Sequence, residues 1–310
     1  MRFAVVNTIY EAALKNKDIM FLTGDLSHVR EKEFKINIPD QYINVGIAEQ
    51  NMIGIAAGLA LSGKKVFVYS IVPFVTMRCF EQVKADVCYQ NLDVNLIGVG
   101  GGFSYGQYGN THCSIEDVAV MRALPNMKIV CPANPMEAEL LTEQVLKLKG
   151  PTYIRIGRGK EPMPAKKYNV YFNKGHYIYK GGKVAVFSYG PILTEAEKAV
   201  HTLREKNIET ELINMLTLKP IDSKLIIETI KRCKAIFTIE EHSIIGGLGS
   251  AIAEIISETN HGPLIFKRFG VNDVYLKEIG TQEYLREKHG ISAEKLVSSI
   301  LRLLRKTSTL

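Results

Sequence analysis

The sequence predicts an α/β protein with two domains, each a mainly parallel β-sheet flanked by helices, and three observations support this fold class. Short apolar runs such as 65–72 and 235–240 lack polar alternation, which is typical of parallel strands covered on both faces. Longer helical stretches separate these runs, as in alternating β and α units. The length of 310 residues suits two domains.

The individual elements follow from the same patterns. We expect strands over the apolar runs 19–22, 65–72, 94–100, 127–132, 152–157, 183–190, 209–215, 235–240 and 263–271. The expected helices include 3–15, 48–61, 134–148, 193–206 and 247–258. Prolines, lysines and glycines over 157–183 interrupt the alternation. The domains are therefore expected over 1–162 and 179–310, with a linker over 163–178.

Composition argues against several classes of protein. The net charge of +7 comes from scattered lysines and arginines without interleaved aromatics, which disfavours a nucleic-acid partner. The five cysteines form no CxxC pair and the seven histidines have no ligand spacing, so a reducing cytosol and no protein-held metal are expected. No apolar run approaches the roughly 18 residues of a membrane helix, and the N-terminus reads as an amphipathic helix. We expect a cytoplasmic protein without membrane association.

Glycine-rich segments do not form a nucleotide fingerprint. The segment "GLALSGK" (58–64) has P-loop spacing, but Lys65 stands where Ser or Thr is needed and a helix precedes the strand. The segments 98–106 and 246–251 are glycine-rich without satisfying GxGxxG.

Glu49 begins the helix 48–61, "AEQNMIGIAAGLAL", and is the first candidate for a functional residue. Apolar or small residues surround this helix, so it is predicted to be buried on all sides, and Gly54 and Gly58 would let a neighbour pack closely. A first-turn glutamate can simply favour the helix start through the dipole. The alternative is a carboxylate buried for chemistry, and the residues alone leave both interpretations open.

Several long segments resemble the transketolase family of thiamine-diphosphate enzymes. "TGDLS" (23–27), "YINVGIAEQNMIGIAAGLALSGKKVFVYS" and "GNTHCSIEDVAVMRALPNMKIVCPANPMEA" (109–138) are similar to its pyrimidine-binding domain. "SYGPILTEAEKA" and "EEHSIIGGLGSAIAE" are similar to its C-terminal domain, in which the resemblance gives Glu241 and His242 structural roles. The similarity extends over essentially the whole chain in the family's order.

The resemblance implies thiamine diphosphate as cofactor. It places Glu49 against N1′ of the aminopyrimidine ring, where a buried carboxylate readily shares a proton and so promotes deprotonation of the thiazolium C2. Phe74 matches the aromatic that stacks on this ring, with a core phenylalanine as the alternative. Asp25 and Leu26 match the pocket wall.

The resemblance also implies substrate contacts. His112 matches a catalytic histidine near the reacting oxygens, and Arg2 and Arg158 match arginines that hold a sugar phosphate, although surface salt bridges are an alternative for both. The chain departs from the family at four positions. Tyr108 replaces an aspartate that reads a sugar hydroxyl, and the other departures are Gly100 for histidine, Val29 for serine and Cys113 for glutamine. We therefore expect transfer of a two-carbon ketol unit from a ketose to an aldose, with a non-standard sugar.

The chain has no GDG segment, which in this family holds Mg²⁺ and the cofactor's diphosphate. The expectation is one subunit of a split enzyme, active only with a partner that supplies this diphosphate-binding domain, in an α2β2 assembly. Three alternatives stay open: the β subunit of a 2-oxo acid dehydrogenase, a deoxyxylulose-phosphate-synthase-like enzyme, and a non-catalytic homologue. The "RCFEQVKADV" segment favours the second, whereas Leu216 in "NMLTLKP" stands where that family usually has arginine.

Overall fold

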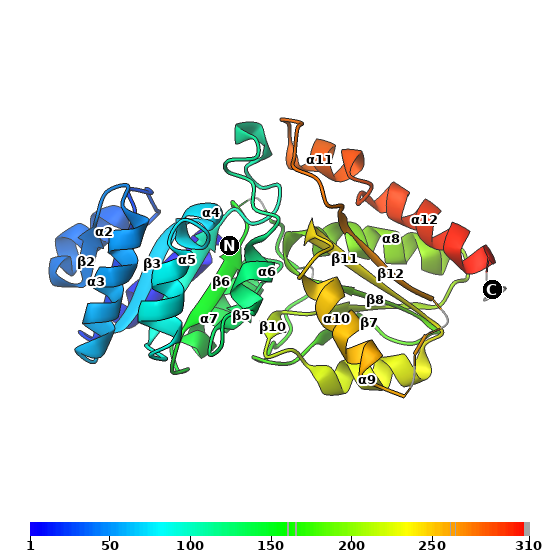
Figure 1. The fold of residues 1–310 in the computed structure, drawn as a ribbon, viewed down its shortest axis with the longest axis horizontal. Coiled ribbons are helices and arrows are strands. Elements are labelled where there is room, and N and C mark those ends of the chain that lie inside the picture. Colours follow the sequence, from blue (N-terminus) through cyan, green and yellow to red (C-terminus); the bar gives the residue numbers. More distant parts are fainter. Residues whose placement is uncertain (160, 165, 261, 264, 307–310) are drawn as a thin grey trace.

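The computed structural model describes residues 1–306 apart from positions 160, 165, 261 and 264, and it confirms the α/β class (Figure 1). The first sheet has seven strands in the order β10-β5-β6-β4-β3-β1-β2, and the second has five in the order β12-β11-β8-β9-β7. Strand β10 pairs antiparallel with β5, and β7 with β9. The remaining pairs are parallel, in agreement with the continuous apolar runs.

The strands match the expected runs closely, and three short edge strands, β2, β7 and β10, were not anticipated. The strands are β1 Ile19–Thr23, β2 Tyr42–Asn44, β3 Lys65–Ile71, β4 Val94–Val99, β5 Lys128–Val130, β6 Thr152–Ile156, β7 His176–Tyr179, β8 Val184–Ser188, β9 Thr210–Asn214, β10 Thr217–Lys219, β11 Ala235–Ser243 and β12 Ile265–Val271. Position 264 of the expected run 263–271 lies outside the described residues.

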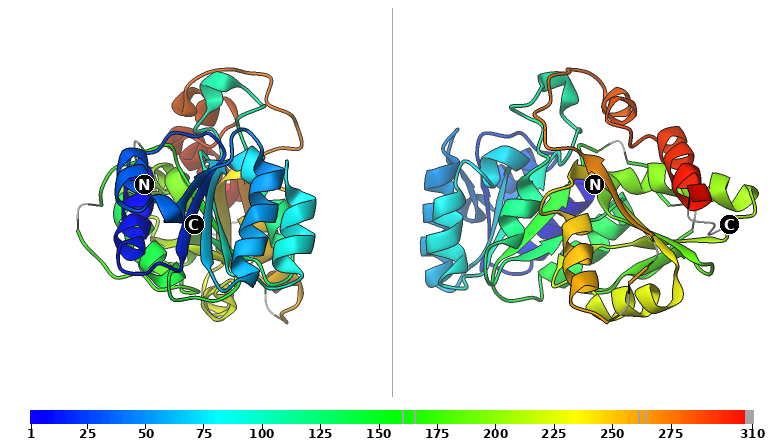
Figure 2. Two further views of the ribbon diagram at one scale, coloured as in Figure 1. Left: turned by 90° about the vertical axis from the view of Figure 1, so that its left-hand side faces the viewer. Right: turned by 45° about the vertical axis from the view of Figure 1, so that its right-hand side comes forward.

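Helices connect these strands and cover both faces of each sheet. The α-helices are α1 Arg2–Ala13, α2 Glu31–Asn37, α3 Glu49–Leu61, α4 Val72–Val75, α5 Phe80–Gln82, α6 Asp117–Arg122, α7 Pro135–Val145, α8 Leu193–Glu205, α9 Ser223–Arg232, α10 Leu248–Ser257, α11 Gln282–Lys288 and α12 Ala293–Lys306. Helices α1 and α7 pack together on one face of the first sheet, with α3 and α5 on the other (Figure 2). None of the helices described is long and apolar enough to cross a membrane.

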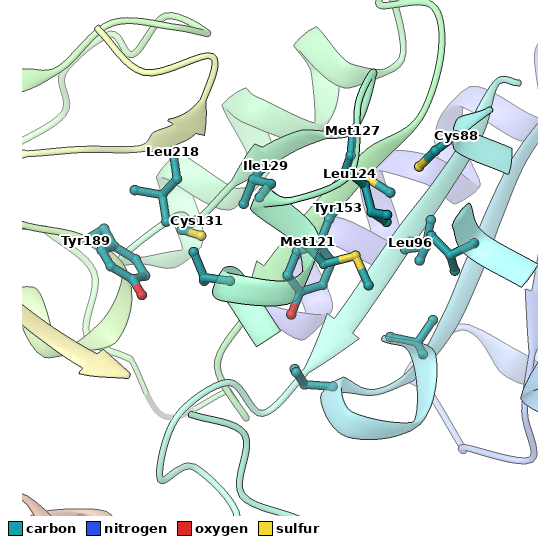
Figure 3. Packing of buried hydrophobic residues seen from close by; sticks show 14 of the residues in the cluster. Cys88, Leu96, Met121, Leu124, Met127, Ile129, Cys131, Tyr153, Tyr189 and Leu218 are labelled. Carbon is teal, nitrogen blue, oxygen red and sulfur yellow. The ribbon is translucent and has the colours of Figure 1, made fainter. Parts of the chain in front are cut away.

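One of the buried hydrophobic clusters contains residues from both halves of the chain. Cys131, from the end of β5, belongs to the same cluster as Tyr189 and Leu218 of the C-terminal half (Figure 3). Strand β10, which carries Leu218, extends the first sheet beside β5, and β7 of the second sheet begins at His176, inside the expected linker. The sheets are therefore fixed against each other by packing across their boundary.

Helix α3 corrects the expectation of burial on all sides. Its inner face, including Met52 and Ile53, is buried, but the side carrying Gln50 and Leu61 is exposed. A methyl group added to Gly54 on this outer side would meet no atom of another described segment within 4 Å. The reason is that small residues make a helix apolar around its circumference, and none of the residues that the structure describes packs on this second side.

His28 is a buried polar side chain enclosed by aromatic rings. Its ring centroid lies 5.0 Å from that of Phe21, 5.6 Å from Tyr42 and 5.7 Å from Tyr69. Among the described residues, neither ring nitrogen has a hydrogen-bond partner. Burial lowers the pKa of His28 from 6.5 to about 4. The folded chain therefore holds this imidazole neutral at a pH where the unfolded chain would protonate it.

His28→Phe is expected to reduce the loss of stability in acid. Below pH 6.5 His28 is protonated in the unfolded state but stays neutral in the folded state. The free energy of unfolding therefore falls as the pH drops toward 4. At pH 5 the free energy of unfolding is lower by about 1–2 kcal/mol because of this protonation. Urea unfolding of both proteins at pH 7.5 and pH 5 measures it. If the free energy of unfolding fell between pH 7.5 and pH 5 by the same amount in His28→Phe as in wild type, the role given to His28 would be wrong.

Candidate active site

The Glu49 carboxylate lies where two parallel strands of the first sheet end. The side chain is 1% exposed, and its Oε1 accepts a hydrogen bond from Ser70 Oγ at 2.8 Å, near the end of β3. A methyl group on Gly24, which follows β1, would come within 3.2 Å of Oε1. The carboxyl ends of parallel strands are the usual ligand-binding edge of such sheets.

Phe74 and Arg78 form the open side of the Glu49 site. Arg78 donates a hydrogen bond from Nη1 to Glu49 Oε2 at 2.6 Å, and its guanidinium carbon lies 4.0 Å from the centroid of the Phe74 ring. The Arg78 side chain is 39% exposed, in contrast to the carboxylate that it contacts. Phe74 is half-buried on α4. A charged carboxylate and a flat aromatic face therefore border the same space.

His112 extends this site toward a cluster of aromatic rings. Its imidazole centroid lies 5.4 Å from that of Phe74 and 5.3 Å from that of Tyr108. The loop carrying Tyr108 and His112 stands beside the loop that precedes α11 (Figure 1). Gly280 N donates to Gly106 O at 3.2 Å, and Leu276 N donates to Asn110 Oδ1 at 3.3 Å. The C-terminal half thus braces the loop that presents His112.

Arg2 and Arg158 approach the aromatic cluster from separate segments. The Arg158 guanidinium carbon lies 5.0 Å from the ring centroid of Tyr105 and 5.7 Å from that of Tyr108. Arg2 donates from Nε to the Tyr69 hydroxyl at 2.9 Å. Burial raises the pKa of Tyr105, and the charges of Arg2 and Arg158 both oppose this rise. The positive charges of two arginines therefore both act on one phenol.

Gly100 explains how Tyr105 reaches this position. The residue has a φ of +84°, and a methyl group on it would lie 2.1 Å from Tyr105 ring carbons. Tyr105 therefore fills the space of any side chain at position 100. Cys113, another departure from the family pattern, is buried, which raises the pKa of its thiol to about 12 and keeps it neutral.

Asp25 and Leu26 lie on the turn after β1. Asp25 is exposed with a φ of +57°, and its N–H donates to Asn44 Oδ1 at 3.3 Å. Leu26 is half-buried and packs against the core beneath α1.

Sequence patterns did not identify Ser70, Arg78 or Tyr105. For Arg78 the four-residue spacing from Phe74 gives no helical signal, because α4 ends at Val75 and Arg78 lies in the turn that follows.

The family whose description is "Transketolase, pyrimidine binding domain" matches residues 1–163, and "Transketolase, C-terminal domain" matches residues 173–296. The chain is 40% identical over 297 residues to a subunit of the apulose-4-phosphate transketolase of Actinobacillus succinogenes, covering 94% of each protein. It is 35% identical to the 6-deoxy-6-sulfo-D-fructose transketolase subunit SqwH of Clostridium sp., covering 96% of this chain and 92% of that protein.

A solved structure described as "Split gene transketolase, inactive beta4 tetramer" superimposes with a TM-score of 0.85. Its sequence is 33% identical, and the match covers 98% of this chain and 97% of that chain.

Proposed function

Because this chain belongs to the transketolase family, we propose that it joins a diphosphate-binding partner to transfer a two-carbon ketol unit from a ketose to an aldose. The arrangement around Glu49 supports the proposal most strongly. A carboxylate with 1% exposure faces the same space as an aromatic ring, at the ligand-binding edge of a parallel sheet. The two relatives described above are transketolase subunits that align over nearly their whole length, which supports ketol transfer over acyl transfer.

The residues around Glu49 fit an aminopyrimidine ring. In the free chain a planar cation, the Arg78 guanidinium, both pairs with Glu49 and lies over Phe74. A protonated aminopyrimidine offers the same chemistry, a flat ring with N–H donors. Thiamine diphosphate, when bound, supplies the nucleophilic carbon and the electron sink of the reaction. The Mg²⁺ that accompanies its diphosphate would be held mainly by the partner.

The chain's own residues have separate tasks in this proposal. Glu49 holds a proton at N1′, because a carboxylate enclosed by Ser70 and the sheet edge has little water with which to exchange it. Phe74 orients the ring, and Asp25 and Leu26 form the adjacent wall. His112, held beside Phe74, donates or accepts a proton at the substrate oxygens.

The partner would complete the site over the exposed side of α3. Glu49 begins this helix, and no described part of the chain covers the helix's outer face at Gly54 and Gly58. Absence of side chains at these positions lets another backbone approach closely. We propose an α2β2 assembly in which this face contacts the diphosphate-binding subunit.

The aromatic and arginine cluster favours a sugar with an anionic end. The names of the two relatives contain a phosphate and a sulfo group. Arg158 lies over the Tyr105 ring and the charge of Arg2 also acts on this phenol, and both guanidinium groups would pair with either anionic group. Tyr105, packed over Gly100, and Tyr108 would then shape the pocket around a non-standard sugar.

Arg158→Ala and Arg2→Ala in the assembled enzyme are expected to raise KM for a ketose with a terminal phosphate or sulfonate about 10- to 100-fold, the effect of losing one charged hydrogen bond. The kcat should change little, because neither arginine contacts the reacting carbonyl. Steady-state kinetics with charged and uncharged ketoses measures this, with exposed Arg302→Ala as control. Equal losses on both kinds of ketose would refute an anion-binding role.

A further inference from the structure

Arg78 contacts the two residues that are proposed to receive the coenzyme ring. Its Nη1 lies 2.6 Å from Glu49 Oε2, and its guanidinium carbon lies 4.0 Å from the Phe74 centroid. The guanidinium therefore both pairs with the carboxylate and covers the aromatic face. No other described residue makes these two contacts together.

We propose that Arg78 occupies the place of the aminopyrimidine ring in the free chain and must swing outward before the coenzyme binds. This inference rests on the proposed function. A ring that stacks on Phe74 and donates to Glu49 needs the volume that the guanidinium fills, because stacking distance and hydrogen-bond distance together fix its position. Arg78 and the ring are therefore mutually exclusive occupants.

The exposure of the two partners makes the exchange possible. Glu49 is 1% exposed and cannot follow a departing partner, whereas Arg78 is 39% exposed and can rotate into water. The residue follows α4 in a short turn, held by Arg78 N donating to Pro73 O at 3.1 Å. The backbone can stay in place while the long side chain changes rotamer.

The contact has opposite effects on the free chain and on coenzyme binding. Without a cation, the Glu49 carboxylate would be a buried and uncompensated charge, so Arg78 stabilises the chain before assembly. The same contact must be broken when the ring enters, so it lowers the apparent affinity for the coenzyme. Arg78 thus influences coenzyme binding through its contact with Glu49.

A second ion pair in the chain provides a matched control. Arg232 donates to Glu211 at 2.6 Å, with side-chain exposures of 41% and 1%, nearly the values of the Arg78–Glu49 pair. Glu211 lies on β9 in the second sheet, and its arginine is on α9. Loss of this arginine should cost stability in the same way without affecting the coenzyme site.

The experiment compares Arg78→Met, Arg78→Lys and Arg232→Met in the free chain and in the complex with its partner. Both methionine variants should lower the thermal unfolding temperature of the free chain. In the complex, calorimetric titration with thiamine diphosphate and Mg²⁺ should give a Kd about tenfold lower for Arg78→Met, the scale of losing one partly exposed ion pair and one cation–π contact. Arg78→Lys should lie between wild type and Arg78→Met, and Arg232→Met should match wild type.

An unchanged or higher Kd for Arg78→Met would overturn the proposal. If that variant does not fold, the wild-type complex crystallised with the coenzyme decides: the proposal requires Arg78 to have left Phe74, and a guanidinium still on Glu49 refutes it. A wild-type complex that binds no thiamine diphosphate would instead refute the proposed function, so the two failures are distinguishable.

Discussion

Glu49→Gln in the assembled enzyme is expected to lower kcat about 100- to 10,000-fold, the usual contribution of a positioned acid–base group. The amide keeps the size of the side chain and can still accept from Ser70, but it cannot exchange a proton with N1′. Steady-state ketol transfer at saturating coenzyme measures the effect. The KM for the sugar should change much less, because the proposed contacts to the anionic end of the sugar are Arg2 and Arg158 and not Glu49.

The control for this variant is Glu211→Gln in the second sheet. The Glu211 carboxylate is as buried as that of Glu49 and is also paired with a partly exposed arginine. It should retain wild-type kcat. Turnover that survives Glu49→Gln unchanged would refute the acid–base role and favour the non-catalytic homologue that the sequence left open.

Omission of the partner is expected to abolish turnover completely. The chain alone should transfer no ketol unit even with saturating thiamine diphosphate and Mg²⁺, because the described residues offer the pyrimidine site while the diphosphate would be held elsewhere. Titration with purified diphosphate-binding subunit should restore activity up to a one-to-one ratio. The solved relative described as an inactive β4 tetramer is a precedent for such behaviour in another protein.

Full turnover by the chain alone would refute the split-enzyme interpretation. The acceptor used by the reconstituted pair separates the remaining alternatives. Transfer to an aldose supports the transketolase-like activity, whereas acylation of lipoamide would identify a 2-oxo acid dehydrogenase subunit.

The sequence predicted the central strands of both sheets because each is a continuous apolar run buried on both faces. It did not predict the edge strands β2, β7 and β10, which are short, and β2 and β7 are also partly exposed. Strand β10 in addition joins the first sheet although its neighbours in sequence belong to the second. Such pairing depends on the packing of the two halves, which local patterns do not encode.

Some features of the candidate site could likewise be predicted from the sequence and others could not. Burial of Glu49 could be predicted, since its helix is apolar and its neighbours match a known family. The contacts of Arg78 and Tyr105 could not, because their side-chain directions depend on the turn after α4 and on the positive φ of Gly100. The exposure of the outer face of α3 could not be predicted either, because composition does not indicate whether a covering surface belongs to the same chain.

The distance between the Glu49 carboxylate and the aminopyrimidine ring tests the central claim most directly. A crystal structure of the two-subunit enzyme with thiamine diphosphate bound should place N1′ at about 2.6–2.9 Å from a Glu49 oxygen, the length of a charge-assisted hydrogen bond. Coenzyme bound with its ring out of contact with Glu49 would contradict the account.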